Sequence, residues 1–165
     1  MGIKERLSIL GIGIIGNQAM VYAFNWVLYP MVIWWLGLGA GFAVMTVLSF
    51  LVCYGLILFY DWAKQDWLGV ETIKELRGYC GDNVAGRLAS WIMKRSEPVV
   101  LIFLSVKFDP FITTIYMRQG AGQYNGMVGR DWKVFIASLI IGDLYWAIAV
   151  FTGISIIEYL LALLR

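Results

Sequence analysis

The stretch "PVVLIFLSVKFDPFITTIYMR", Pro98 to Arg118, decides the fold, because it is long and apolar enough to cross a bilayer but carries a lysine, an aspartate and a proline at its middle. Each charge at a bilayer centre costs roughly 2.5–3.5 kcal/mol on insertion scales, so such residues face a protein interior, a partner or water. Pro110 frees the carbonyl of Val106 and disfavours helical geometry at Asp109. We expect a local break in this helix.

The rest of the chain has the composition of a membrane protein. Hydrophobic residues make up 61% of its 165 residues, and no residue from Leu7 to Tyr60 is charged. An uncharged run of this length accommodates two membrane spans of about 20–25 residues each. We expect these spans at about 8–35 and 42–60, with the turn between them in "GLGAG", Gly37 to Gly41.

The character of the sequence changes after residue 60. The segment 61–97 carries six basic and six acidic residues, and its apolar residues recur at helical spacing. We predict two short interfacial amphipathic helices there, at about 63–79 and 83–95. Two further apolar runs, 98–117 and 134–162, complete an all-α, polytopic membrane protein with four transmembrane helices. Residues 1–165 then form a single membrane domain, within which 61–97 is a cytoplasmic or interfacial helical segment.

The distribution of lysine and arginine predicts the orientation of the spans. With four spans and the N-terminus inside, nine basic residues lie in the cytoplasm against three outside, which favours cytoplasmic N- and C-termini. A rival topology makes 98–117 a re-entrant hairpin and keeps everything from 61 to 133 inside, at twelve basic residues to one. The four-span topology is our first choice, because the half-helices of a re-entrant segment are short and need burial against neighbours.

Charged residues at membrane depth are the main candidates for a site. Lys107 and Asp109 lie at the predicted break, with the Thr113 hydroxyl one turn further on. Asp143 and Glu158 interrupt the last apolar run and are separated by fourteen residues, so that at least one of them lies within the hydrocarbon layer. We predict that these five residues bind an ion or a small solute. The alternative is a structural role, as buried ties within or between subunits.

Other polar residues are weaker candidates. Asn17, Gln18 and Asn25 lie in the first span, where interhelical hydrogen bonds are a simpler role than a solute site. Arg118 and Arg130 flank a glycine-rich connection and are candidates for binding an anion or a lipid headgroup. A flexible connecting loop is the simpler interpretation of that connection.

The residues that the chain lacks also restrict its function. It has no histidine and only two cysteines, far apart in the sequence, which argues against histidine-ligated haem, histidine-dependent hydrolysis and thiolate metal clusters. We therefore expect no metal and no cofactor, and favour a role other than catalysis. Nothing in the sequence favours nucleic-acid binding.

The leading hypothesis is a small transporter or channel for an ion or small solute, with its polar site at the proline-broken helix. The alternative is a non-catalytic accessory, assembly or scaffold subunit of a membrane complex. Either protein would lie in the plasma membrane, which is the inner membrane if the source is prokaryotic, among membrane lipids. Because four spans enclose little space, we also expect a homo-oligomer or a membrane partner subunit.

Overall fold

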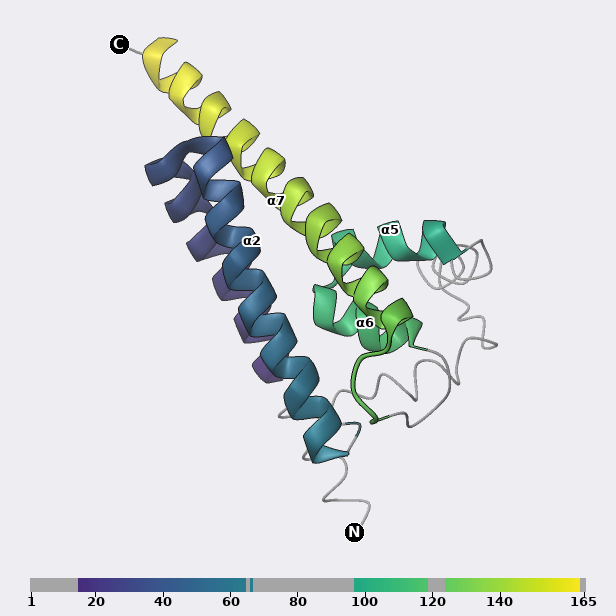
Figure 1. The fold of residues 1–165 in the computed structure, drawn as a ribbon. Helices are drawn as coiled ribbons and strands as arrows, with labels where there is room; N and C mark the ends of the chain where they lie inside the picture. The colour runs from purple at the N-terminus through teal and green to yellow at the C-terminus, as the bar shows by residue number, and fades with distance from the viewer. Residues whose placement is uncertain (1–14, 65, 67–96, 119–123, 164–165) are drawn as a thin grey trace, which may run out of the picture.

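The computed structural model describes residues 15–64, 66, 97–118 and 124–163, and all regular secondary structure in these ranges is helical (Figure 1). The elements are a short π-helix η1 (Phe24–Leu28), α2 (Tyr29–Ala63), α5 (Glu97–Lys107), α6 (Pro110–Met117) and α7 (Gly129–Leu163). The predicted all-α class is confirmed. Two helical segments, Ile15–Ala63 and Gly129–Ala162, are long and apolar enough to cross a membrane. The interfacial helices predicted at 63–79 and 83–95 lie almost wholly outside the described residues.

The first of these segments is a helical hairpin, because the chain reverses at Gly37, where φ is 72° and ψ is 177°. This backbone conformation favours glycine, which has no Cβ. Tyr29 and Ser49 both donate hydrogen bonds to Asp143 Oδ1, although one straight helix would hold them about 30 Å apart. Residues 15–36 and 38–63 therefore form two antiparallel arms, seen side by side in Figure 1. The turn lies within the predicted "GLGAG".

Close packing holds the two arms together near the turn. A Cβ atom on Gly41 would lie 2.7 Å from Cδ1 of Ile33 in the opposite arm, so the helices approach at a distance that only glycine allows there. Tyr29, Ile33 and Met45 are buried in the core at this end, together with Ala147 of α7. This packing fixes the position of Tyr29 relative to α7.

The segment expected to be a single transmembrane helix at 98–117 is instead two short helices, α5 of 11 residues and α6 of 8. Asp109 lies between them in an extended conformation, and its Oδ1 accepts a hydrogen bond of 2.7 Å from the backbone N–H of Ile112. It is therefore the N-cap of α6, with Pro110 at the first helical position, where a missing N–H costs nothing. The predicted break is confirmed, and its consequence is a reversal of the chain.

Two ion pairs show that both ends of this segment lie at the same level of α7. Glu97 contacts Arg130 at 2.9 Å, and Arg118 contacts the adjacent Asp131 at 3.2 Å. The tip of the segment lies about 18 Å further along α7, where the Ser105 carbonyl is 2.8 Å from a Cβ built on Gly142. The segment therefore enters the protein and returns, as in the rival topology.

Burial explains why two such short helices are stable here. Phe111, Thr113 and Ile115 of α6 are at most 1% exposed, and α6 packs against both α2 and α7. Non-helical backbone at membrane depth is tolerated where protein surrounds it in this way. The structure thus has two short packed helices over 98–117 where one transmembrane helix was expected, because the apolar side chains of α6 pack against α2 and α7.

The last helix begins earlier than predicted, at Gly129 rather than at about 134. Asp131 lies in its first turn, where a carboxylate is favourable near the helix N-terminus, and its Oδ2 accepts a 3.3 Å hydrogen bond from Val128 N–H. Polar residues therefore extend the helix beyond the apolar run. Arg118, Asp61 and Asp131 meet at this end of the molecule. The C-terminal end of α7 lies at the other end (Figure 1).

Candidate functional site

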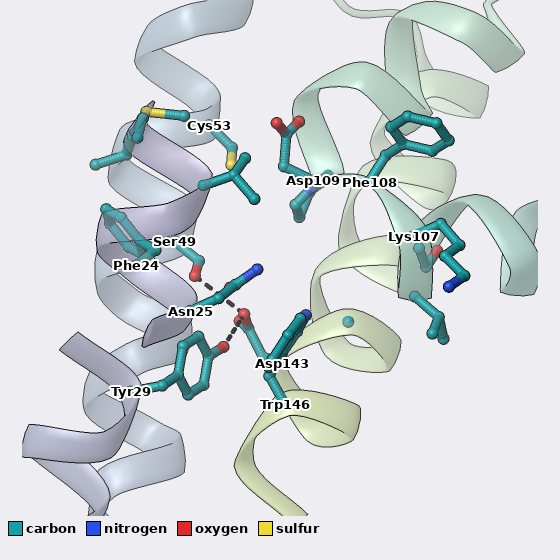
Figure 2. A pocket seen from close by; sticks show the side chains of 17 residues that line it. Phe24, Asn25, Tyr29, Ser49, Cys53, Lys107, Phe108, Asp109, Asp143 and Trp146 are labelled. Atoms are coloured by element: carbon teal, nitrogen blue, oxygen red, sulfur yellow. Dashed lines mark hydrogen bonds between the residues drawn. The ribbon is translucent and has the colours of Figure 1, made fainter. Parts of the chain in front are cut away.

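A cavity of about 70 Å³ lies where the tip of the α5–α6 hairpin meets both arms of the helical hairpin and α7. It has room for a few water-sized molecules, at roughly 30 Å³ for each water in the liquid. Figure 2 shows that side chains from all of these elements converge on it. The polar side chains that the argument uses come from Asn25, Tyr29, Ser49, Lys107, Asp109 and Asp143.

Asp143 is the central residue of this cavity and is only 5% exposed. Its Oδ1 accepts hydrogen bonds from the Tyr29 hydroxyl and, at 3.0 Å, from the Ser49 hydroxyl, one from each arm (Figure 2). Its Oδ2 is buried and has no hydrogen-bond partner among the described residues. A buried polar atom left unpaired costs about 1–3 kcal/mol of folding free energy. This oxygen therefore either destabilises the fold or contacts a bound ligand.

Asp109 provides the second carboxyl group at the cavity. Its Oδ1 is used as the cap of α6, whereas its Oδ2 is buried and, within the described part of the chain, unpartnered. Asn17, which is 8% exposed, lies against this carboxyl group. Two carboxyl groups from different elements thus each bring one unpaired oxygen to the same region.

Lys107 lies next to the cavity but does not neutralise either acid. Its side chain is exposed and extends away from Asp109 and Asp143 in Figure 2, and no ion pair joins it to an acid among the residues described. Because Lys107 ends α5 and Asp109 begins α6, the two side chains leave the backbone in different directions. Lys107 therefore forms no ion pair with Asp109 or Asp143.

The remaining main candidates lie away from the cavity. Thr113 is fully buried in α6 and its hydroxyl has no partner among the described residues, but it does not line the cavity. Glu158 is exposed and lies about 22 Å beyond Asp143 along α7. The structure therefore brings Asp109 and Asp143 together with Lys107 beside them, and leaves Thr113 and Glu158 apart.

Among the amides of the first arm, Asn25 lines the cavity, Asn17 faces Asp109, and Gln18 is exposed. Asn25 lies in η1, where the Tyr29 N–H bonds to the Phe24 carbonyl, five residues back. π-turns of this kind often occur at functional sites.

The sequence analysis missed Tyr29 and Ser49, the two hydroxyl donors to Asp143. One signal for the first was present: Pro30 lacks an N–H and its ring clashes with the carbonyl four residues back, which disturbs the preceding turn. Nothing in the sequence distinguished Ser49 from other small polar residues in an apolar helix.

The arginines proposed for an anion are instead paired with acids. Arg118 is 6% exposed and contacts Asp61 at 2.6 Å and Asp131 at 3.2 Å. Arg130 contacts Glu97 at 2.9 Å. These pairs join the ends of α2, α5 and α6 to the start of α7, so both guanidinium groups hold the fold together. Neither lines the cavity.

Comparison with known proteins adds no further assignment, because no family model, curated protein or solved structure matches the chain. Within the described ranges, no group of three or more histidine, cysteine, aspartate or glutamate side chains could hold a metal ion. The candidate site is therefore defined by its own geometry: a small internal cavity, two carboxyl groups with unpaired oxygens, and neutral hydroxyl and amide groups around them.

Proposed function

We propose that this protein is a small transporter or channel for an ion or small solute and that the cavity around Asp143 is its binding site. The observation that carries this proposal is the pair of buried, unpartnered carboxyl oxygens, on Asp109 and Asp143, at one internal cavity. Ionisable residues within membrane-spanning segments are costly and generally mark ion or solute pathways. Broken helices beside such residues are a recurring way to build these sites.

The proposed topology has three crossings, formed by the two arms and α7, with α5 and α6 as a re-entrant hairpin. Four of the five described basic residues lie toward the end at which α7 begins, namely Lys64, Arg118, Arg130 and Lys133, whereas Lys107 lies at the hairpin tip. The positive-inside rule assigns the end with four basic residues to the cytoplasm. The N-terminus is then cytoplasmic, and the C-terminus lies on the opposite side rather than inside. Asp143 lies about 15 Å deeper than Lys133, halfway through a core of about 30 Å.

Cysteine labelling in intact cells tests this topology after Cys53 and Cys80 are replaced. We expect Asn125→Cys to be protected from a membrane-impermeant reagent and Ala162→Cys to be labelled, because these exposed residues lie at opposite ends of α7 and its preceding loop. The four-span topology predicts the reverse pattern, so labelling at Asn125 with protection at Ala162 would refute the re-entrant arrangement.

Solute uptake into liposomes containing the purified protein tests the function. Asp143→Asn removes a charge but retains an acceptor for Tyr29 and Ser49, so we expect uptake to fall at least about tenfold with little loss of folding. Glu158→Gln makes the same change at an exposed position on the same helix and should leave uptake unchanged. Equal uptake by wild type and folded Asp143→Asn protein would remove Asp143 from the pathway.

One observation favours the alternative, a structural subunit of a membrane complex. Asp143 Oδ1 accepts hydrogen bonds from both arms, which is what a tie between helices would do. A structural hydrogen-bonded contact requires the acceptor oxygen and not the charge. This alternative therefore predicts that Asp143→Asn protein still assembles with its partner, and that wild-type protein transports no solute. Absence of uptake across a broad panel of ions and small solutes would favour this alternative.

A further inference from the structure

The charges around the cavity restrict what it can bind. Asp109 and Asp143 are the acids that line it, and Lys107 is the one described cationic residue in its lining. Lys107 extends away from both carboxyl groups (Figure 2). The guanidinium of Arg118 contacts Asp61 and Asp131 at the end where α7 begins. Among the described residues, no cation balances these acids from within the cavity.

The unpaired atoms at the cavity are acceptors. The Tyr29 and Ser49 hydroxyls use their hydrogens on Asp143 Oδ1, and the Ser105 hydroxyl donates to the Leu101 carbonyl at 2.7 Å. What remains unsatisfied is Oδ2 of Asp143 and Oδ2 of Asp109, both buried. An anion would meet two carboxyl oxygens with only the neutral Asn25 amide as a donor beside them, whereas a cation would meet free lone pairs.

We infer that the cavity is a site for a small monovalent cation, a proton or an alkali-metal ion, bound at Asp143 with Asp109 as the second acid. This inference rests on the proposed function, whose solute class it narrows. The size of the cavity fits, because about 70 Å³ accommodates a small ion with a few water molecules. Hydroxyl and amide oxygens from Tyr29, Ser49 and Asn25 are neutral ligands of the kind that alkali-metal ions accept.

Asp109 offers a well-matched variant for testing the inference. Asn is as good an N-cap as Asp, so Asp109→Asn keeps an acceptor for the Ile112 N–H and removes only the charge and the second carboxylate oxygen. If Asp143→Asn fails to fold, this second variant keeps the inference testable. Glu158→Gln is the control, because it also removes one acid from the chain but lies in the exposed end of α7.

The experiment measures uptake of H⁺, Na⁺, K⁺ and Cl⁻ separately in liposomes containing the full chain. We expect uptake of at least one cation, little uptake of Cl⁻, and a loss of at least about tenfold in Asp143→Asn or Asp109→Asn protein but not in Glu158→Gln protein. A pH-sensitive dye reports H⁺ and isotope tracers report the metal ions, which separates the two kinds of cation. Cl⁻ uptake that exceeds cation uptake and survives both aspartate substitutions would overturn the inference and leave a transport function in place.

A binding measurement distinguishes failure of the inference from failure of the transport proposal. The midpoint of thermal unfolding in detergent is compared in NaCl, KCl and choline chloride, and again across pH, since a ligand that binds only the folded state raises the midpoint. A cation- or proton-dependent shift that Asp143→Asn removes, without any uptake, would support the cation site and refute transport. No shift and no cation uptake in the wild type would refute the cation site.

Discussion

Acidic residues occur in two contrasting environments in this protein. At the end where α7 begins, Asp61, Asp131 and Glu97 each contact an arginine. At the cavity, Asp109 and Asp143 accept hydrogen bonds only from neutral groups and keep one buried oxygen free. Where an arginine reaches the acids, the ion pairs tie helices together, and where none does, a carboxyl oxygen has no partner among the described residues. The difference lies in the partners and not in the residue type.

The stability of the protein should depend most on the arginine-paired acids at the end where α7 begins. Arg118→Ala leaves Asp61 and Asp131 without their buried cation, and we expect a loss of about 3–5 kcal/mol in the free energy of unfolding. Arg118→Lys keeps the charge but lacks the planar group that reaches both acids. Its free energy of unfolding should therefore lie between those of Arg118→Ala and wild-type protein. Denaturation in detergent measures both, and an unchanged midpoint for Arg118→Ala would mean that this end does not hold the fold.

The cavity end holds the hairpin tip by close packing rather than by charge. Gly142→Ala places a methyl group 2.8 Å from the Ser105 carbonyl oxygen, and we expect a loss of about 1–3 kcal/mol as α5 is pushed from α7. Gly153→Ala on the same helix meets nothing within 4 Å and should stabilise by up to about 1 kcal/mol. Thermal unfolding of the two variants compares them, and equal stability would show that α5 shifts without cost.

The neutral donors at Asp143 should contribute less than a buried ion pair. Tyr29→Phe removes one hydrogen bond to Oδ1, and we expect a loss of about 0.5–2 kcal/mol, the range for interhelical hydrogen bonds in membranes. Tyr22→Phe in the same arm changes an exposed hydroxyl and serves as the control. A larger loss of unfolding free energy for Tyr29→Phe than for Arg118→Ala would show that the neutral hydrogen bonds at the cavity stabilise the fold more than the buried ion pairs do.

The smallest loss of stability is expected for the exposed ion pair at the end where α7 begins, Arg130 with Glu97. Arg130 and Glu97 are 34% and 70% exposed at their side chains, so Arg130→Ala should cost less than about 1 kcal/mol. High salt should remove most of that difference, because exposed pairs are screened. A loss comparable to that of Arg118→Ala would show that burial is not what distinguishes the two arginines.

Local features of this fold were predictable from the sequence. The uncharged run ending at Tyr60 and the glycines around Gly37 predicted a helical hairpin, and Pro110 predicted the break beside Asp109. These inferences needed only neighbouring residues, because helix breaks and tight turns depend on local backbone preferences. Asp143 was also singled out as a residue that needs an environment of its own, and it is buried against hydroxyl groups from both arms.

The return of the chain after that break depended on distant partners. Arg118 reaches Asp61 and Asp131, and these residues are far apart in the sequence, so no local pattern indicated which way α6 would run. Basic-residue counts did favour the re-entrant topology, but the burial that makes short half-helices stable is a property of the packed structure. For the same reason, the hydroxyl donors to Asp143 were not identified.

The depth of Asp143 has a consequence for the electrical behaviour of a bound charge. In the proposed topology, about half of the hydrocarbon core separates it from either surface, so a monovalent ion that travels from one side to this carboxyl group crosses about half of the membrane potential. Moving one charge through the whole membrane potential is worth about 2.3 kcal/mol per 100 mV. Crossing half of a 100 mV potential therefore changes the occupancy of the site roughly sevenfold. Occupancy of this site should therefore follow the membrane potential even when ion concentrations are held equal on both sides.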